Sequence, residues 1–128
     1  MPTLDPSELL DIGRRLAALR DEGVLILGSG FSTQNLREMN MAAPPDAEPP
    51  TWSSEFDHWL EEMLGRGEVD ELIDFERRAP AATLAHPRTE HFAPLFVALG
   101  AVADDQLAPS TAIDGFWYGL SKRSIQFD

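Results

Sequence analysis

Ile12-Gly-Arg-Arg-Leu-Ala-Ala-Leu-Arg-Asp-Glu-Gly-Val-Leu-Ile-Leu-Gly-Ser-Gly30 is the stretch of sequence that decides the predicted fold. Its first part belongs to a helix that Asp5 can cap, with Pro6 at the first helical position, and that Gly23 ends. Residues 24–27 are all apolar and predict a short buried strand. A helix that feeds a buried strand is half of an α/β repeat, and the strand before it is missing from this sequence. We therefore expect an α/β fold.

Three helices and a strand pair are predicted downstream of a proline-rich loop at residues 42–50. Apolar residues at helical spacing mark the helices, between Trp52 and Met63, between Val69 and Phe75, and between Phe92 and Leu99. Ser53 or Ser54 is expected to cap the first of these helices, and Gly65 and Gly67 to end it. The tail, Gly115-Phe-Trp-Tyr-Gly followed by Ser124-Ile-Gln-Phe, predicts a last pair of strands with a turn.

The composition favours one domain, residues 1–128, and excludes several kinds of site. The sequence has no cysteine, which excludes disulfides and thiolate metal sites and fits a cytoplasmic protein. No apolar run approaches the ~18 residues of a membrane span, and the N-terminus carries no secretion signal. The net charge of −12, from 22 acidic and 10 basic residues, would repel a phosphate backbone. We therefore expect no membrane and no nucleic-acid partner.

Three histidines are the candidate metal ligands or acid/base groups. His58 lies on an acidic helix, which favours a surface residue. His86 precedes a proline, which favours a loop residue without a special role. His91 lies at the predicted start of the helix that contains Pro94, where the dipole favours the neutral imidazole that a metal needs. Because a non-haem iron site takes two histidines and a carboxylate, local features alone favour a structural role for His91. Glu90 could supply a carboxylate, or could simply be an acid at a helix start.

Gly28-Ser29-Gly30 follows the predicted strand, at the end of a strand where α/β sheets usually bind ligands. The turn lacks the third glycine of a dinucleotide site and the lysine of a phosphate loop. Two glycines after a strand are equally typical of a tight turn without a ligand.

Four separated motifs stand in a recognisable order. They are the stretch from Ile12 to Gly30, Asn35-Leu-Arg, Pro87-Arg-Thr-Glu-His-Phe-Ala-Pro-Leu-Phe-Val-Ala-Leu-Gly-Ala, and the final Ser-Ile-Gln-Phe. With these motifs, the sequence resembles the class III extradiol ring-cleavage dioxygenases of the dihydroxyphenylalanine (DOPA) type from about Leu9 to Phe127. These enzymes share a superfamily with the protocatechuate 4,5-dioxygenase catalytic subunit. The resemblance covers only their C-terminal half, which implies part of an extradiol dioxygenase-like sheet flanked by helices.

The resemblance implies a non-haem metal, Fe(II) or Zn(II), and a small catechol-type aromatic substrate. His91 matches the family's late histidine, which is a metal ligand. Gln34 stands where the family has a histidine at the metal and the substrate, and Asn35 beside it corresponds to a substrate-binding position. Glutamine cannot accept and return a proton as imidazole can, so we expect poor acid/base catalysis there. The family's first two histidine ligands lie in the N-terminal half, which this sequence lacks.

Two functions remain open. The first is an oxidoreductase, an extradiol ring-opening dioxygenase that is inactive until an N-terminal half supplies the missing histidines; the intact Glu90-His91 pair favours it. The second is a non-catalytic, degenerate domain that associates through the Trp52 and Trp59 helix or a sheet edge; Gln34 favours it. Half of a sheet leaves an unpaired edge, so either function predicts a homo-oligomer or a complex with a complementary half.

Overall fold

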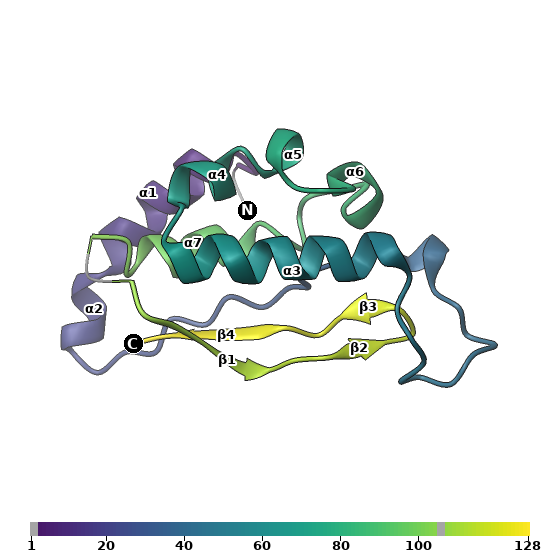
Figure 1. Ribbon diagram of the computed structural model, residues 1–128. Helices are drawn as coiled ribbons and strands as arrows, with labels where there is room; N and C mark the ends of the chain where they lie inside the picture. Colours follow the sequence, from purple (N-terminus) through teal and green to yellow (C-terminus); the bar gives the residue numbers. More distant parts are fainter. Residues whose placement is uncertain (1–2, 105–106) are drawn as a thin grey trace.

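The structure, a computed structural model, describes residues 3–104 and 107–128, and it combines helices with small sheets. The helices are α1 (Pro6–Leu16), α2 (Ala18–Asp21), η1 (Leu36–Glu38), α3 (Thr51–Arg66), α4 (Val69–Ile73), α5 (Phe75–Arg78), α6 (Ala82–Ala85) and α7 (Pro94–Gly100). The strands are β1 (Pro109–Ile113), β2 (Phe116–Trp117), β3 (Leu120–Ser121) and β4 (Ser124–Phe127). In Figure 1 the strands lie below α3, and α1, α4, α5 and α6 lie above it.

The N-terminal helix begins as the sequence predicts. The Asp5 side chain accepts hydrogen bonds from the backbone N–H groups of Ser7 and Glu8, which caps the first turn of α1. The helical path is interrupted at Ala17, so that α2 is a separate short helix. Gly23, with a φ of 78°, follows α2 in the left-handed conformation that glycine adopts without strain.

Two glycines let α1 and α7 cross at close range. A Cβ atom on Gly13 would lie 2.2 Å from the Val97 carbonyl oxygen, and one on Gly100 would lie 2.1 Å from the Leu10 carbonyl oxygen. Only hydrogen fits at either position. This crossing fixes α7, whose first turn follows His91 in the chain.

Residues 24–27 do not form the buried strand that the sequence predicts. The segment is exposed, with Leu25 84% and Leu27 81% accessible. From Leu25 to Gly30, no backbone group bonds to another within the described part of the chain. An apolar run becomes a buried strand only where neighbouring strands pair with it and layers cover its faces. This segment has α7 on one side and no strand beside it among the described residues.

The core lies between α3, α7 and the short helices α4 to α6. Its largest fully buried side chains are aromatic and aliphatic, and include Phe56, Phe75, Phe92, Phe96, Leu9, Leu60, Leu72 and Leu99. As predicted, Gly67 follows the last turn of α3 in the left-handed conformation, with a φ of 69°. The predicted cap is wrong, because α3 begins at Thr51 after Pro50, and Ser53 is buried inside the first turn.

Both stretches of the predicted strand pair contain a strand, but the two strands do not pair with each other. β2 pairs with β3 across a two-residue turn in which Tyr118 and Gly119 have φ values of 47° and 85°, as in the type I′ turns that match the twist of a hairpin. β4 pairs with β1, a strand that the sequence did not predict. Both sheets are two-stranded and antiparallel, so the α/β repeat with a buried sheet is not found within the described residues.

Within residues 3–104 and 107–128, no helix is both long and apolar enough to cross a membrane.

Candidate functional site

The segment from Phe31 to Asn35 docks against the loop that contains both His86 and His91. The Phe31 N–H group donates to the His91 carbonyl oxygen at 2.8 Å, and the Gln34 N–H group donates to the Ala85 carbonyl oxygen at 2.9 Å. These bonds run between two stretches far apart in the sequence. They bring the predicted site residues Gln34, Asn35 and His91 onto two adjoining segments.

The Gly28-Ser29-Gly30 turn gives the first of these segments its close approach to His91. A Cβ atom on Gly30 would lie 2.0 Å from the His91 carbonyl oxygen, and one on Gly28 would lie 2.6 Å from the Pro94 carbonyl oxygen. Any side chain at these two positions would push the turn away from the start of α7. The two glycines are therefore required for this close backbone packing beside His91, independently of any ligand.

Gln34 carries an unsatisfied polar atom. Its backbone is held by Ala85, yet its side-chain Oε1 atom is buried and has no hydrogen-bond partner among the described residues. A buried acceptor without a donor costs about 1–3 kcal/mol, and native proteins leave few such atoms. The hydrogen-bonding capacity of the amide oxygen is therefore unused within the described residues.

Asn35 differs from Gln34 because both ends of its side chain are already bonded. Its Nδ2 atom donates to the Leu84 carbonyl oxygen at 2.8 Å, and its Oδ1 atom accepts from the Arg37 N–H group at 3.2 Å, which caps η1. The residue is 7% exposed. Direct contact with a substrate would require these bonds to break, so this geometry supports an anchoring role.

His91 is exposed and lies two residues before the cap of α7, which is Ala93. It borders the groove described below. Its neighbour Glu90 is occupied by an ion pair, with 2.9 Å between its Oε1 atom and the Nε atom of Arg88. Within the described residues, no three histidine or acidic side chains gather as a metal site would require. His58 is exposed on α3, as predicted.

His86 has a structural role that the sequence did not indicate. It is 4% exposed, and its ring contacts Phe56 and Phe92 with centroid distances of 5.2 and 4.7 Å. Its Nε2–H group donates a hydrogen bond to the Ser32 carbonyl oxygen at 2.8 Å. The Nδ1 atom is buried without a partner among the described residues. Burial lowers the pKa of His86 to about 4. Proline at position 87 favoured a loop, but the preceding helix α6 turns the ring into the core.

Stability is expected to fall as the pH drops from about 6.5 to 4, because of His86. The unfolded chain binds a proton near pH 6.5, whereas the native imidazole stays neutral until about pH 4. In this window the unfolded state holds more protons, so the free energy of unfolding falls by about 1.4 kcal/mol per pH unit of acidification. Urea titrations at pH 7 and pH 5 measure the change. His86→Gln should flatten the slope and the exposed His58→Gln should not; equal slopes for all three proteins would contradict this origin.

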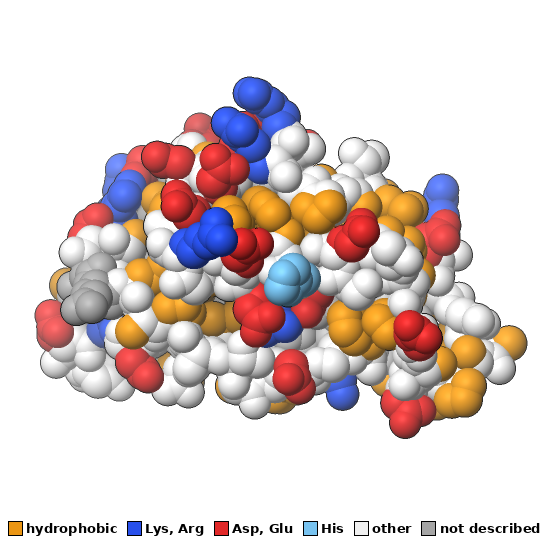
Figure 2. Space-filling view, in the orientation of Figure 1, with side chains coloured by type: hydrophobic (Ala, Val, Ile, Leu, Met, Phe, Trp, Pro, Cys, Tyr) orange, Lys and Arg blue, Asp and Glu red, His pale blue; other side chains and the backbone are white. Residues whose placement is uncertain are grey.

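A buried polar network, which the sequence did not reveal, ties the hairpin to α3. Arg123 precedes β4, and two of its guanidinium nitrogens donate to the Asp57 carboxylate of α3. The distances are 2.9 Å from Nε to Oδ1 and 2.7 Å from Nη2 to Oδ2. The two side chains are only 8% and 9% exposed. Ser121 also donates to Asp57, and the pKa of Arg123 is raised by its hydrogen bond to that carboxylate. Acidic side chains are scattered over the rest of this face (Figure 2).

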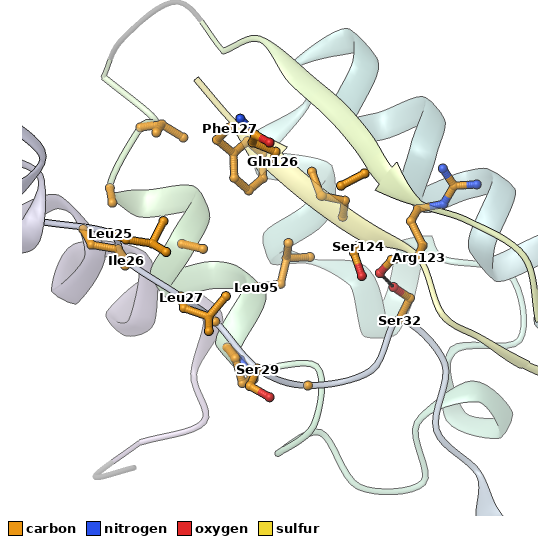
Figure 3. Close-up of a pocket in the computed structure, with 18 of the residues that line it drawn as sticks. Leu25, Ile26, Leu27, Ser29, Ser32, Leu95, Arg123, Ser124, Gln126 and Phe127 are labelled. Carbon is orange, nitrogen blue, oxygen red and sulfur yellow. Dashed lines mark hydrogen bonds between the residues drawn. The ribbon is translucent and has the colours of Figure 1, made fainter. Parts of the chain in front are cut away.

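A groove of about 840 Å³, lined by both apolar and polar groups, lies between residues 24–32 and β4. It closes at one end, where the Ser32 hydroxyl donates to the Arg123 carbonyl oxygen at 3.0 Å. Figure 3 shows Leu25 and Leu27 on one side, Phe127 on the other, and Leu95 of α7 between them.

Known proteins resemble this chain in sequence and in fold. Residues 1–118 match the family described as the catalytic LigB subunit of aromatic ring-opening dioxygenase. The 4,5-DOPA dioxygenase extradiol of Beta vulgaris is 40% identical over 97% of this chain and 45% of its own length. That of Escherichia coli (strain K12) is 34% identical over 91% and 43%. The crystal structure of an uncharacterized protein from Escherichia coli K12 matches with a TM-score of 0.83 and 31% identity, over 94% of this chain and 49% of that one.

The chain therefore belongs to the LigB family of aromatic ring-opening dioxygenases, as its motifs predicted. It spans less than half the length of these two curated relatives.

Proposed function

We propose that this chain is part of an extradiol dioxygenase, an oxidoreductase that opens a catechol-type ring with dioxygen. The family match over residues 1–118 carries the proposal. The hydrogen bonds that join the segment of Gln34 to the loop of His91 support it. Because the chain covers less than half of the two curated relatives, the activity requires a complementary part, on the same polypeptide or on another.

The metal that the family implies, Fe(II) or Zn(II), does not fit the described residues by themselves. Iron and zinc sites take at least three protein ligands, and no such group gathers in the described part of the chain. In our proposal His91 supplies one ligand, and the complementary part supplies the others. No catalytic step can be assigned to residues of this chain through the metal.

The roles of the other two predicted residues follow from their hydrogen bonds. Gln34 would present its side-chain amide to a substrate hydroxyl group by rotating the Oε1 atom, which is buried and has no partner among the described residues. Asn35 would hold the backbone of Gln34 in place through Leu84 and the start of η1. In this proposal Gln34 contacts the substrate, and Asn35 positions Gln34.

We expect the isolated chain to retain no stoichiometric metal after mild chelation. It should form the yellow ring-opened product from a catechol only together with a complementary part, with added Fe(II) and under air. The part of the Escherichia coli 4,5-DOPA dioxygenase extradiol outside the match can serve for co-expression. Elemental analysis and visible absorbance are the measurements.

His91→Ala is the control, since it should remove the metal from the co-expressed complex. About one tightly bound metal per isolated chain would contradict the incomplete site. A complex that retains metal but opens none of a panel of catechols would contradict the proposed activity.

A second function is a non-catalytic domain that acts in protein association. The observation that favours it is Gln34, where the resemblance places a histidine. In that case the complex with the complementary part would form without ring opening, with or without a histidine at position 34.

A further inference from the structure

The backbone on both sides of the groove between residues 24–32 and β4 lacks the partners that strands normally have. The segment from Leu25 to Gly30 makes no backbone hydrogen bond within the described residues. β4 pairs with β1 along one edge, and no described strand lies along its other edge. Exposed rows of N–H and C=O groups are templates for an added strand. The segment and β4 lie on opposite sides of this groove (Figure 3).

The side chains of the segment are also unsuited to water. Leu25 and Leu27 are 84% and 81% exposed, the highest values among the large hydrophobic side chains of the described residues. Leu95, Ile125 and Phe127 continue the apolar surface across the groove and pack on the core. Burial of such leucines stabilises a complex by about 1.5–3 kcal/mol each. The groove therefore combines an apolar floor with unpaired strand edges.

We infer that an extended strand from the complementary part of the dioxygenase binds in this groove. It pairs with segment 24–30 and with β4 by strand addition. This inference rests on the proposed function. The matched crystal structure holds this fold within a chain about twice as long, which provides the polypeptide to fill the groove. Strand addition supplies main-chain hydrogen bonds for affinity, and alternate side chains for specificity.

The charge of the chain argues against a second copy as the occupant. Each copy carries a net charge of −12, and like charges of this size oppose self-association. Asp21 and Glu22 lie shortly before the segment in the chain, and Asp128 follows β4, so a symmetric contact would bring these acids together. A small polar ligand fits less well, because Arg123 at the closed end is already bound by Asp57 and Glu61.

The test uses the full chain co-expressed with the unmatched part of the Escherichia coli 4,5-DOPA dioxygenase extradiol. We expect the two to co-purify, and amide hydrogen exchange at residues 24–30 and 124–127 to slow relative to the chain alone. Leu27→Asp should weaken binding by about 30-fold or more, as loss of a central interface residue does. Met41→Asp is the matched control, because Met41 is 64% exposed and lies outside the groove; it should bind as the wild type does.

Several other results would overturn the inference. The groove is not the binding site if no complex forms, or if the complex shows no slowed exchange at residues 24–30. Equal binding of Leu27→Asp and Met41→Asp would also exclude it. Slowed exchange that grows with concentration in the chain alone would assign the groove to a second copy. Ring-opened product that forms despite Leu27→Asp would support the proposed function and contradict strand binding in the groove. Slowed exchange in the groove without any product would support strand binding and contradict the proposed function.

Discussion

Replacing Gln34 by histidine should raise ring opening by the reconstituted protein by roughly 10²- to 10⁴-fold, the usual contribution of a general acid or base. The amide of Gln34 can accept a hydrogen bond through its Oε1 atom, yet it cannot take up and return a proton near neutral pH. Imidazole in the same place can do both. The measurement is the rate at which the yellow product appears from a catechol, with Fe(II) and air.

The backbone of Gln34 is held by Ala85 at 2.9 Å, so the histidine should occupy the same position. His91→Ala serves as the second variant, because it should abolish metal retention and activity together. Equal turnover by the wild type and Gln34→His would show that position 34 is not an acid/base site, which removes the main support for a degenerate domain. If neither the wild type nor Gln34→His opens a catechol, and His91→Ala leaves the metal content unchanged, the chain shares only the fold of the family.

The sequence predicted those elements whose signals are local. The Asp5 cap, the amphipathic α3 and the Gly67 end are determined by neighbouring residues, and all three are found. Residues 24–27 carry an equally clear signal, yet the outcome depends on strands that the described chain does not contain. A buried strand is a property of its neighbours as much as of its own residues.

The candidate site was predicted only through the family motifs. Gln34, Asn35 and His91 are 57 residues apart at their extremes (34 to 91), and no spacing rule brings them together. The hydrogen bonds from segment 31–35 to the loop at 84–91 do so. The family motifs also gave no role to His86, because its burial depends on how α6 packs against Phe56 and Phe92.

The Asp57–Arg123 pair could not be predicted from sequence at all, because 66 residues separate its members. On α3, Asp57 has the pattern of a surface acid next to His58 and Glu61. Burial follows from the hairpin, which lays Arg123 and Ser121 across that face. This pair gives the largest stability effect that we expect in the molecule.

Asp57→Ala should lower the free energy of unfolding by about 3–5 kcal/mol, since it leaves the Arg123 guanidinium buried without its main partner. The loss is a large share of the ~5–15 kcal/mol that stabilises a typical domain. Because Arg123 joins β3 to β4, the hairpin should detach from α3 first. Urea denaturation measures the change, and amide exchange in β3 and β4 should locate it. Asp57→Asn serves if the alanine variant does not fold.

Glu61→Ala is the matched control, because Glu61 binds the same guanidinium at 3.0 Å from a side chain that is 53% exposed. An exposed ion pair contributes about 0–1 kcal/mol, so this variant should unfold almost as the wild type does. Replacing Asp57 and Arg123 together by leucine should recover part of the lost stability, since no charge then stays buried alone. An Asp57→Ala protein within about 1 kcal/mol of the wild type would mean that water reaches Arg123 and that the pair does not hold the hairpin.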